Sequence, residues 1–283
     1  MNRVILKKIP LRAVPFLGAG EKIHRWLFGL FLIQFVLIWL NLWVPWPDFG
    51  KARWPDGVLI VLTAATTVAS LTRQLPAQNV MLASTIIVFI AGAVQTIGTL
   101  SGIPFGPYHF TKRIGQVLFE PLPWAAPLVW LIAILNARGT SRLILRPWRK
   151  TRNYGFWLMG LTALLVVLFD VGLEPFATEV KHYWEWGPSH AGVYWYRTPW
   201  VNFVGWAATV VVILAFVTPS LIYKRPEKKA AKHPPDYHPL IVWVLINFLF
   251  ATGAVSQHLW AAAGVMLATT TSAAIFAIKG GTW

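Results

Sequence analysis

The chain has 283 residues, of which 56% are hydrophobic and 12% charged, with a formal net charge of +15 and a mean hydropathy of +0.56. Soluble domains carry about 25% charged residues, so the composition excludes an ordinary soluble protein and predicts an integral membrane protein. There is no cysteine, which excludes disulfides, thiolate nucleophiles and thiolate-bound metals. The basic residues fall in clusters between apolar runs, a pattern that favours contact with anionic lipid headgroups over nucleic-acid binding.

Eight apolar stretches approach the length of about 20 residues that a membrane-spanning helix needs. In chain order they are Trp26–Val44, Gly57–Leu75, Val80–Leu100, Pro123–Asn136, Gly155–Leu173, Trp200–Tyr223, Pro239–Ser256 and Leu259–Ile278. The fourth is short and rich in proline. We therefore predict an all-α polytopic bundle, with a basic segment at residues 1–25 and a single transmembrane helical domain at residues 26–278. The N-terminus lacks a compact apolar core followed by small residues, so we expect no removable signal peptide.

Lys and Arg are distributed unevenly between the two sides of this bundle. The N-terminal tail, the cluster Arg138–Arg152 and the cluster Lys224–Lys232 share one side with the C-terminus. The positive-inside rule places that side, and both termini, in the cytoplasm. Most of the 10 acidic residues fall on the opposite side: Asp48, Asp56, Glu120, Asp170, Glu174, Glu179 and Glu185. We therefore expect any functional site to open at the non-cytoplasmic end.

Two of these acids, Asp170 and Glu174, end the fifth apolar stretch. Because they are four residues apart, they lie on the same face of a helix. An ionisable residue at membrane depth is costly and indicates function by default. The structural alternative is an ion pair or a helix-end hydrogen bond, and it is stronger for Glu174, which lies nearer the interface.

Other polar and aromatic residues are expected at the same outer end. The run 102–111 is rich in Gly and Pro, which turn the chain and fix the height of Tyr108 and His109. Gln95 lies on the polar face of the third span, and Asn202 and Trp206 share one face of the sixth. Simpler roles exist: most of the 17 Trp residues suit an interfacial belt, and polar residues within spans suit interhelical hydrogen bonds.

Several classes of membrane protein are disfavoured by the same pattern. No Lys lies within a predicted span, which argues against a retinal Schiff base. The chain has no pair of Asp-rich motifs for magnesium diphosphate and no glycine-rich nucleotide motif. No His residues are spaced three or four apart, so a haem or di-iron site has little support.

Three ordered runs resemble elements of a known membrane family. Residues 104–111, Pro-Phe-Gly-Pro-Tyr-His-Phe-Thr, resemble its Pro-Phe-Gly-x-Tyr-x-Tyr/Phe-Thr element, and residues 170–175 resemble Asp-x-x-x-Asp-Pro. Trp184-x-Trp186, followed by Tyr196-x-x-Pro199-x-x-Asn202-x-x-Gly205-Trp206, resembles the third element. The family is the carotenoid biosynthesis proteins of bacteria and archaea, typified by carotenoid 1,2-hydratases, also called bisanhydrobacterioruberin hydratases. The likeness covers roughly residues 80–223.

Two residues depart from the family pattern. Glu174 stands where Asp is usual, which keeps the acid and lengthens its reach. Arg197 stands where a small Gly is expected before Pro199. The larger side chain is expected to narrow the opening of the site or to add a positive charge there.

The resemblance implies a hydro-lyase of the bacterial cytoplasmic membrane that adds water to the terminal C1=C2 bond of an acyclic, lycopene-like carotenoid. No metal or redox cofactor is expected. The implied proton donor is Asp170, with Glu174 sharing the proton or orienting the water. Tyr108 and His109 are expected to form a polar wall and proton route. The expected substrate-binding residues are Phe105, Trp184, Trp186, Tyr196, Asn202, Trp206 and Gln95.

Three other functions stay open at this point. A carotenoid end-group cyclase or isomerase would use the same acid but exclude water. A carotenoid-binding or scaffold subunit would join other carotenoid enzymes or a pigment–protein complex without catalysis. The hypothesis of a transporter has less support, because the sequence shows no inverted repeat.

Overall fold

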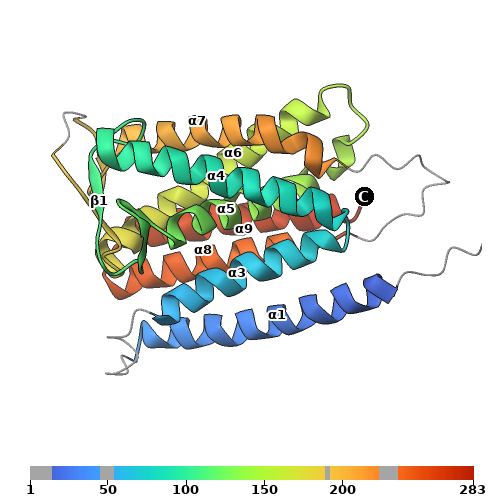
Figure 1. Ribbon diagram of the computed structural model, residues 1–283, viewed down its shortest axis with the longest axis horizontal. Helices are drawn as coiled ribbons and strands as arrows, with labels where there is room; N and C mark the ends of the chain where they lie inside the picture. Colours follow the sequence, from blue (N-terminus) through green and yellow to red (C-terminus); the bar gives the residue numbers. More distant parts are fainter. Residues whose placement is uncertain (1–14, 45–53, 189–191, 223–234) are drawn as a thin grey trace, which may run out of the picture.

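The computed structural model describes residues 15–44, 54–188, 192–222 and 235–283, and these residues form a bundle of long helices (Figure 1). The helices are α1 (Pro15–Asn41), α3 (Trp54–Thr72), α4 (Ala77–Ser101), α5 (Ala125–Ile144), α6 (Tyr154–Pro175), α7 (Trp200–Val217), α8 (His238–Ser256) and α9 (Trp260–Gly281). Each predicted span overlaps one of these helices, so the predicted all-α membrane bundle is confirmed. Residues 1–14, Asp48, Tyr223 and the cluster Lys224–Lys232 lie outside the described ranges.

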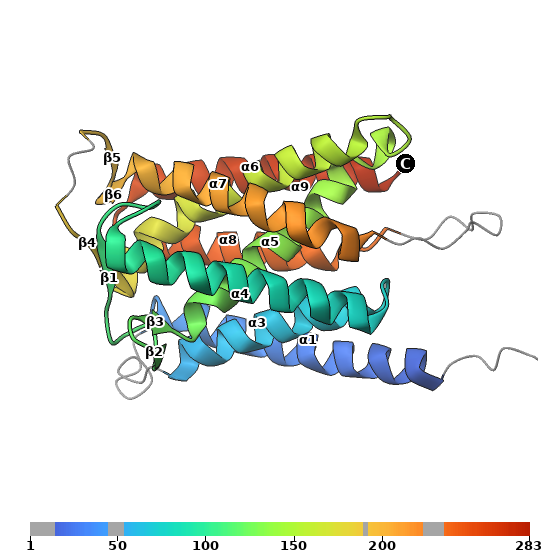
Figure 2. The same ribbon diagram turned by 45° about the horizontal axis from the view of Figure 1, so that its top comes forward.

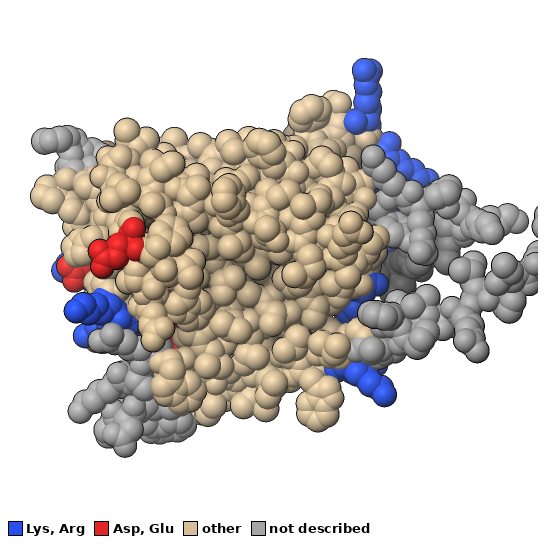
Figure 3. Space-filling model, in the orientation of Figure 1, with Lys and Arg blue, Asp and Glu red and all other residues tan. Residues whose placement is uncertain are grey.

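The long apolar sequences form helices because only a helix satisfies its own backbone hydrogen bonds in lipid. Of the eight helices in the described ranges, all but α5 are long and apolar enough to span a membrane by length and composition. Large apolar side chains such as Phe89 and Phe156 face outward. In the view of Figure 3, an uncharged belt separates charged side chains at the two ends of the bundle. The chain is therefore a multi-pass membrane protein.

Helix α5 is longer than the predicted stretch, which ended at Asn136. It packs against α3, α4, α6, α8 and α9, so that most of its surface touches protein rather than lipid. Arg138 and Arg142 therefore lie within the helix and not in the following loop. Arg138 is buried and donates a hydrogen bond to the Leu221 carbonyl. Protein surroundings allow polar residues where lipid would not.

Three short strand pairs gather at one end of the bundle, opposite the C-terminus and the N-terminal end of α1 (Figures 1 and 2). They pair β1 (Tyr108–Phe110) with β4 (Trp184–Trp186), β2 (Val117–Phe119) with β3 (Leu122–Pro123), and β5 (Tyr194–Trp195) with β6 (Thr198–Pro199). The described ends of the chain thus lie at one end of the bundle, as predicted. That this end faces the cytoplasm stays a prediction.

Helix α6 ends irregularly beneath these strands. Pro175 has no backbone N–H, so the Val171 carbonyl lacks its helical donor. The indole N–H of Trp195 donates to that carbonyl instead, at 3.0 Å. The chain then continues as a π-helical turn over Phe176–Val180, a deviation that is frequent at functional sites.

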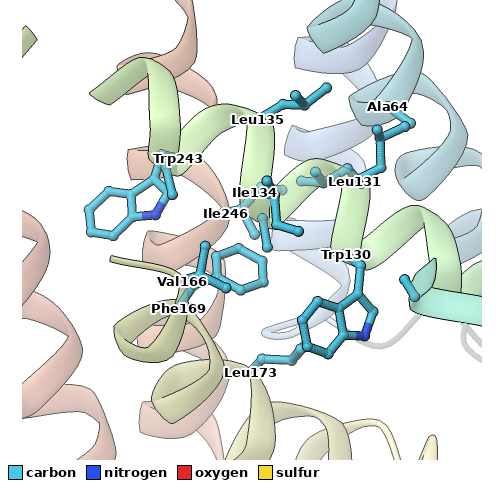
Figure 4. Packing of buried hydrophobic residues seen from close by; sticks show 14 of the residues in the cluster. Ala64, Trp130, Leu131, Ile134, Leu135, Val166, Phe169, Leu173, Trp243 and Ile246 are labelled. Atoms are coloured by element: carbon cyan, nitrogen blue, oxygen red, sulfur yellow. The ribbon is translucent and has the colours of Figure 1, made fainter. Parts of the chain in front are cut away.

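The apolar core lies where α5, α6 and α8 meet (Figure 4). Trp130 from α5 lies near Leu173 from α6, while Phe169 of α6 packs edge to face on Phe250 of α8. This packing holds the outer half of α6, which carries the two acidic residues, in the middle of the bundle.

Candidate active site

The pairing of β1 with β4 brings together two sequence motifs that are more than 70 residues apart. In this register Tyr108 lies opposite Trp186 and Phe110 lies opposite Trp184. Alternate residues of a strand point to opposite faces, so these four side chains turn toward the bundle. His109 and Glu185, which pair with each other, turn outward.

Asp170 and Glu174 lie on one face of α6, as predicted, and both side chains are buried. One amide group joins them: the Nδ2 atom of Asn202, on α7, donates to Asp170 Oδ2 at 2.7 Å and to Glu174 Oε1 at 3.2 Å. Among the described residues neither carboxylate takes part in a salt bridge. The structural ion pair considered for Asp170 is therefore absent from this part of the chain.

The second oxygen of Glu174 lies at the meeting point of three donors. Oε2 accepts hydrogen bonds from the indole nitrogens of Trp184 and Trp186 and from the hydroxyl of Thr198, each at 3.0 Å. In contrast, Oδ1 of Asp170 is buried and has no hydrogen-bond partner among the described residues. A buried polar atom of this kind needs a partner, so the acid pair has spare hydrogen-bonding capacity.

Glu174 faces a cavity that encloses about 420 Å³ of empty space, part of which is open to the surroundings. The cavity is lined by Gln95, Phe105, Tyr108, Phe110, Ile114, Ala126, Val129, Trp130, Leu173, Glu174, Trp184, Trp186, Asn202 and Trp206. Asp170 does not line it and lies behind Glu174 and Asn202. The cavity therefore presents one carboxyl group to a ligand, and the second is enclosed.

Aromatic rings form much of this wall. Trp130 and Trp206 stack with their ring centres 3.7 Å apart and their planes 12° from parallel. Trp186 lies against Tyr108, with ring centres 5.3 Å apart. Aromatic faces attract positive charge, so this wall suits an electron-poor centre next to Glu174.

Tyr108 places a hydroxyl group on the polar side of the cavity. It donates to the side-chain oxygen of Gln95 and accepts from the Thr99 hydroxyl at 3.2 Å. Burial raises the pKa of Tyr108 above its usual value, so the hydroxyl stays protonated and acts as a hydrogen-bond donor. The predicted approach of Gln95 and Thr99 to this end is thus observed.

Two of the predicted site residues and one departure from the family pattern lie away from the cavity. His109 is exposed, with its Nε2 atom 3.6 Å from Glu185. The Tyr196 hydroxyl instead accepts from the backbone N–H of Ala262, on α9, at 3.1 Å. Arg197 is exposed and pairs with Glu179 at 3.2 Å. The structure thus brings nine of the eleven predicted residues together, with Asp170 behind the wall and the others around Glu174.

The sequence-based prediction missed three polar or aromatic members of the site: Phe110, Trp130 and Thr198. Thr198 donates to Glu174, and its only signal in the sequence is its place just before Pro199. Trp130 lies in the middle of the fourth span, far from either interface. A Trp at that depth does not suit an interfacial belt, and this position was the available signal.

The described residues contain no group of three or more His, Asp or Glu side chains that is arranged to hold a metal ion. The site consists instead of two carboxyl groups, amides, a phenol, a threonine hydroxyl and indole rings. Such groups can hold and move protons and can bind an apolar molecule with one reactive end.

These features define a multi-pass membrane protein with an enclosed acid pair beside an aromatic cavity. Residues 56–273 match the family model described as "carotenoid biosynthesis protein", and the chain belongs to that family. The bisanhydrobacterioruberin hydratase of Haloarcula japonica is 26% identical over 123 residues, or 43% of this chain and 39% of the hydratase. The match thus spans well under half of that relative. No solved structure matches the chain.

Proposed function

We propose that the protein is a carotenoid hydratase that adds water across the terminal C1=C2 bond of an acyclic, lycopene-like carotenoid. The observation that carries this proposal is the position of Glu174. Its carboxyl group faces an aromatic cavity and shares the Asn202 amide with the enclosed Asp170. The family match and the distant hydratase relative support carotenoid modification.

The first step needs a proton, and the acid pair is suited to hold one. Burying two unpaired carboxylates side by side is very unfavourable, so the pair retains a proton. Glu174 accepts four hydrogen bonds, which stabilise its charged form, whereas Asp170 accepts one. We therefore assign the resting proton to Asp170. Because only Glu174 lines the cavity, we assign to Glu174 the delivery of the pair's proton to the substrate.

In the proposed reaction this proton forms a C–H bond at C2, and the electron pair of the C1=C2 bond is used for it. The tertiary cation left at C1 lies against the Trp130–Trp206 stack, which stabilises positive charge. A water molecule bonds to C1 and gives up a proton to the acid pair. The pair is restored, and the substrate has gained one water molecule.

The polar side of the cavity favours hydration over cyclisation. Gln95, Tyr108 and Asn202 line the cavity beside Glu174 and provide partners for a water molecule. A cyclase would need this wall to be apolar so that the cation loses a proton instead. A binding subunit would need no acid pair. We further propose the bacterial cytoplasmic membrane as the location.

The test is expression in a lycopene-accumulating bacterium, with pigment masses measured after chromatography. We expect the wild-type protein to add the mass of one or two water molecules. Asp170→Asn and Glu174→Gln should each lower hydration by about 10²–10⁴-fold, the usual contribution of a general acid or base. Glu185→Gln is the matched control, because that carboxylate is exposed on β4, and it should keep full activity.

Other products would redirect the assignment. A pigment of unchanged mass with a spectrum shifted by ring formation would identify a cyclase. An unchanged pigment that stays bound to the purified protein would identify a binding role. Full hydration by folded Asp170→Asn and Glu174→Gln proteins would remove the acid pair from the mechanism.

A further inference from the structure

A second cavity lies beside the first and has a different lining. It encloses about 640 Å³ of empty space, part of it open to the surroundings, among α3, α5, α6 and α8. Most of its wall is aliphatic or aromatic, including Leu59, Ile132, Phe169, Ile246, Leu249 and Phe250. We call it the apolar chamber. Phe169 and Ile246 belong to the packed core drawn in Figure 4.

The apolar chamber and the Glu174 cavity share one wall. Ile114, Val129, Leu173 and Trp184 line both spaces. Leu173 directly precedes Glu174, and Trp184 donates its indole N–H to Glu174. The two spaces therefore lie on either side of these four side chains, and the apolar chamber is directly next to the acid pair.

Polar residues of the apolar chamber are engaged by other parts of the protein. The Thr63 hydroxyl donates to the Leu59 carbonyl at 2.6 Å. Lys181 contacts both oxygens of Asp56, at 2.8 and 3.1 Å. The Tyr183 hydroxyl lies beside Asp56, and burial together with that carboxylate raises the pKa of Tyr183. The chamber therefore presents little hydrogen-bonding capacity to a ligand, in contrast to the Glu174 cavity.

We propose that the apolar chamber binds the isoprenoid chain of the substrate while the end group lies in the Glu174 cavity, an inference that rests on the proposed function. A hydrocarbon chain needs no polar partner and is bound by removing its surface from water or lipid and packing it. The four shared side chains place the chamber next to the end-group cavity, and the substrate would displace them to occupy both spaces. The chamber thus selects long acyclic substrates, whereas the Glu174 cavity selects the end group.

The test fills the chamber without touching the acid pair. Leu249, on α8, is buried and lines the apolar chamber but not the Glu174 cavity, so Leu249→Trp should reduce the volume of the chamber. Leu267→Trp is the matched control, because Leu267 of α9 faces outward with 46% of its surface exposed. Leu249→Phe is a milder filling variant for the case in which Trp prevents folding. Elution of each protein in detergent establishes that it is folded.

Each variant is given lycopene and geranylacetone, a short ketone that carries the same dimethyl-alkene end. We expect Leu249→Trp to lower lycopene hydration by at least about tenfold, as for other size discriminations in apolar pockets, and to leave geranylacetone hydration unchanged. Leu267→Trp should match the wild type with both compounds. Full lycopene hydration by folded Leu249→Trp, or an equal loss with both compounds, would overturn the proposal.

Retention of lycopene by the purified proteins separates this inference from the proposed function. If the wild type hydrates neither compound, the hydratase proposal fails. The chamber is then still supported when the wild type and Leu267→Trp retain lycopene and Leu249→Trp does not. Equal retention by all three proteins, no retention by any, or a co-purified phospholipid that lycopene does not displace would each refute a chamber for the isoprenoid chain. If the wild type hydrates lycopene but not geranylacetone, retention of lycopene by the same three proteins again tests whether the apolar chamber binds the isoprenoid chain.

Discussion

Replacing Asn202 by Ala tests whether one amide holds the acid pair together. The substitution removes the 2.7 Å hydrogen bond to Asp170 and the 3.2 Å hydrogen bond to Glu174. Glu174 keeps its three donors on Oε2, whereas Asp170 loses the only side-chain donor that it has among the described residues. The position of Asp170 should therefore change more than that of Glu174.

The magnitude follows from the charge and burial of the partners. With the resting proton on Asp170, its hydrogen bond from Asn202 joins neutral groups and contributes about 0.5–1.5 kcal/mol, whereas the bond to the charged Glu174 contributes about 1.5–3 kcal/mol. We expect Asn202→Ala to lower the free energy of unfolding by about 2–4 kcal/mol, the combined loss of the two hydrogen bonds. Asn247→Ala is the matched control. That Asn is also buried, but its Nδ2 atom donates within its own helix, to Trp243, so the loss should be about 1 kcal/mol.

The assay is equilibrium unfolding in mixed detergent micelles, together with product analysis in lycopene-accumulating cells. Asn202→Ala should unfold at a lower denaturant concentration than Asn247→Ala and should lose hydration. The reasoning fails if the two variants have equal free energies of unfolding, or if Asn202→Ala yields as much hydrated pigment as the wild type. Either result would mean that the acid pair is held by contacts other than this amide.

Three further substitutions probe the surroundings of the acid pair. Tyr108→Phe removes a buried hydroxyl that bonds to Gln95 and should lower the free energy of unfolding by about 1–3 kcal/mol; an unchanged unfolding curve would contradict this. His109→Ala should leave hydration unchanged, because the ring is exposed and points away from the cavity; a large loss of product would return His109 to the proton route. Gly205→Ala should destabilise the protein by about 1–3 kcal/mol, since a Cβ atom there would lie 2.8 Å from the carbonyl oxygen of Pro104, in the loop between α4 and β1. Gly160→Ala, with open space at its Cβ position, is its control in thermal unfolding.

The helices and the acid pair could be predicted because each leaves a local signal. Spans follow from the length of apolar runs, and two carboxylates four residues apart share a helix face whatever surrounds them. Helix α5 was predicted too short because the hydropathy reading treats Arg138 as the end of a span. In the structure α5 is enclosed by other helices, and that enclosure is a property of the whole bundle.

It was harder to predict which residues around the acid pair point into the cavity, since the side-chain directions depend on short strands that hydropathy does not reveal. Once Tyr108 and Phe110 point inward on β1, the period of two residues sends His109 outward. Tyr196 lies in the turn between β5 and β6 with a φ of 53°, which separates it from Thr198 on the next strand. The strand that fixes these side-chain directions by pairing is distant in the sequence, so no local sequence pattern predicts the pairing.

The two departures from the family pattern differ in their structural consequences. Arg197 pairs with Glu179 and does not line the cavity, so its charge is remote from Glu174. Glu174 stands at the centre of the site, and its length lets one carboxyl group reach Asn202 on α7 with Oε1 and the donors from β4 and β6 with Oε2. An Asp at this position would be one methylene shorter and would meet both sets only if α6 moved toward them. Any difference from its relatives in the ligand that the cavity accepts is therefore expected to originate at Glu174, where the longer acid faces the cavity.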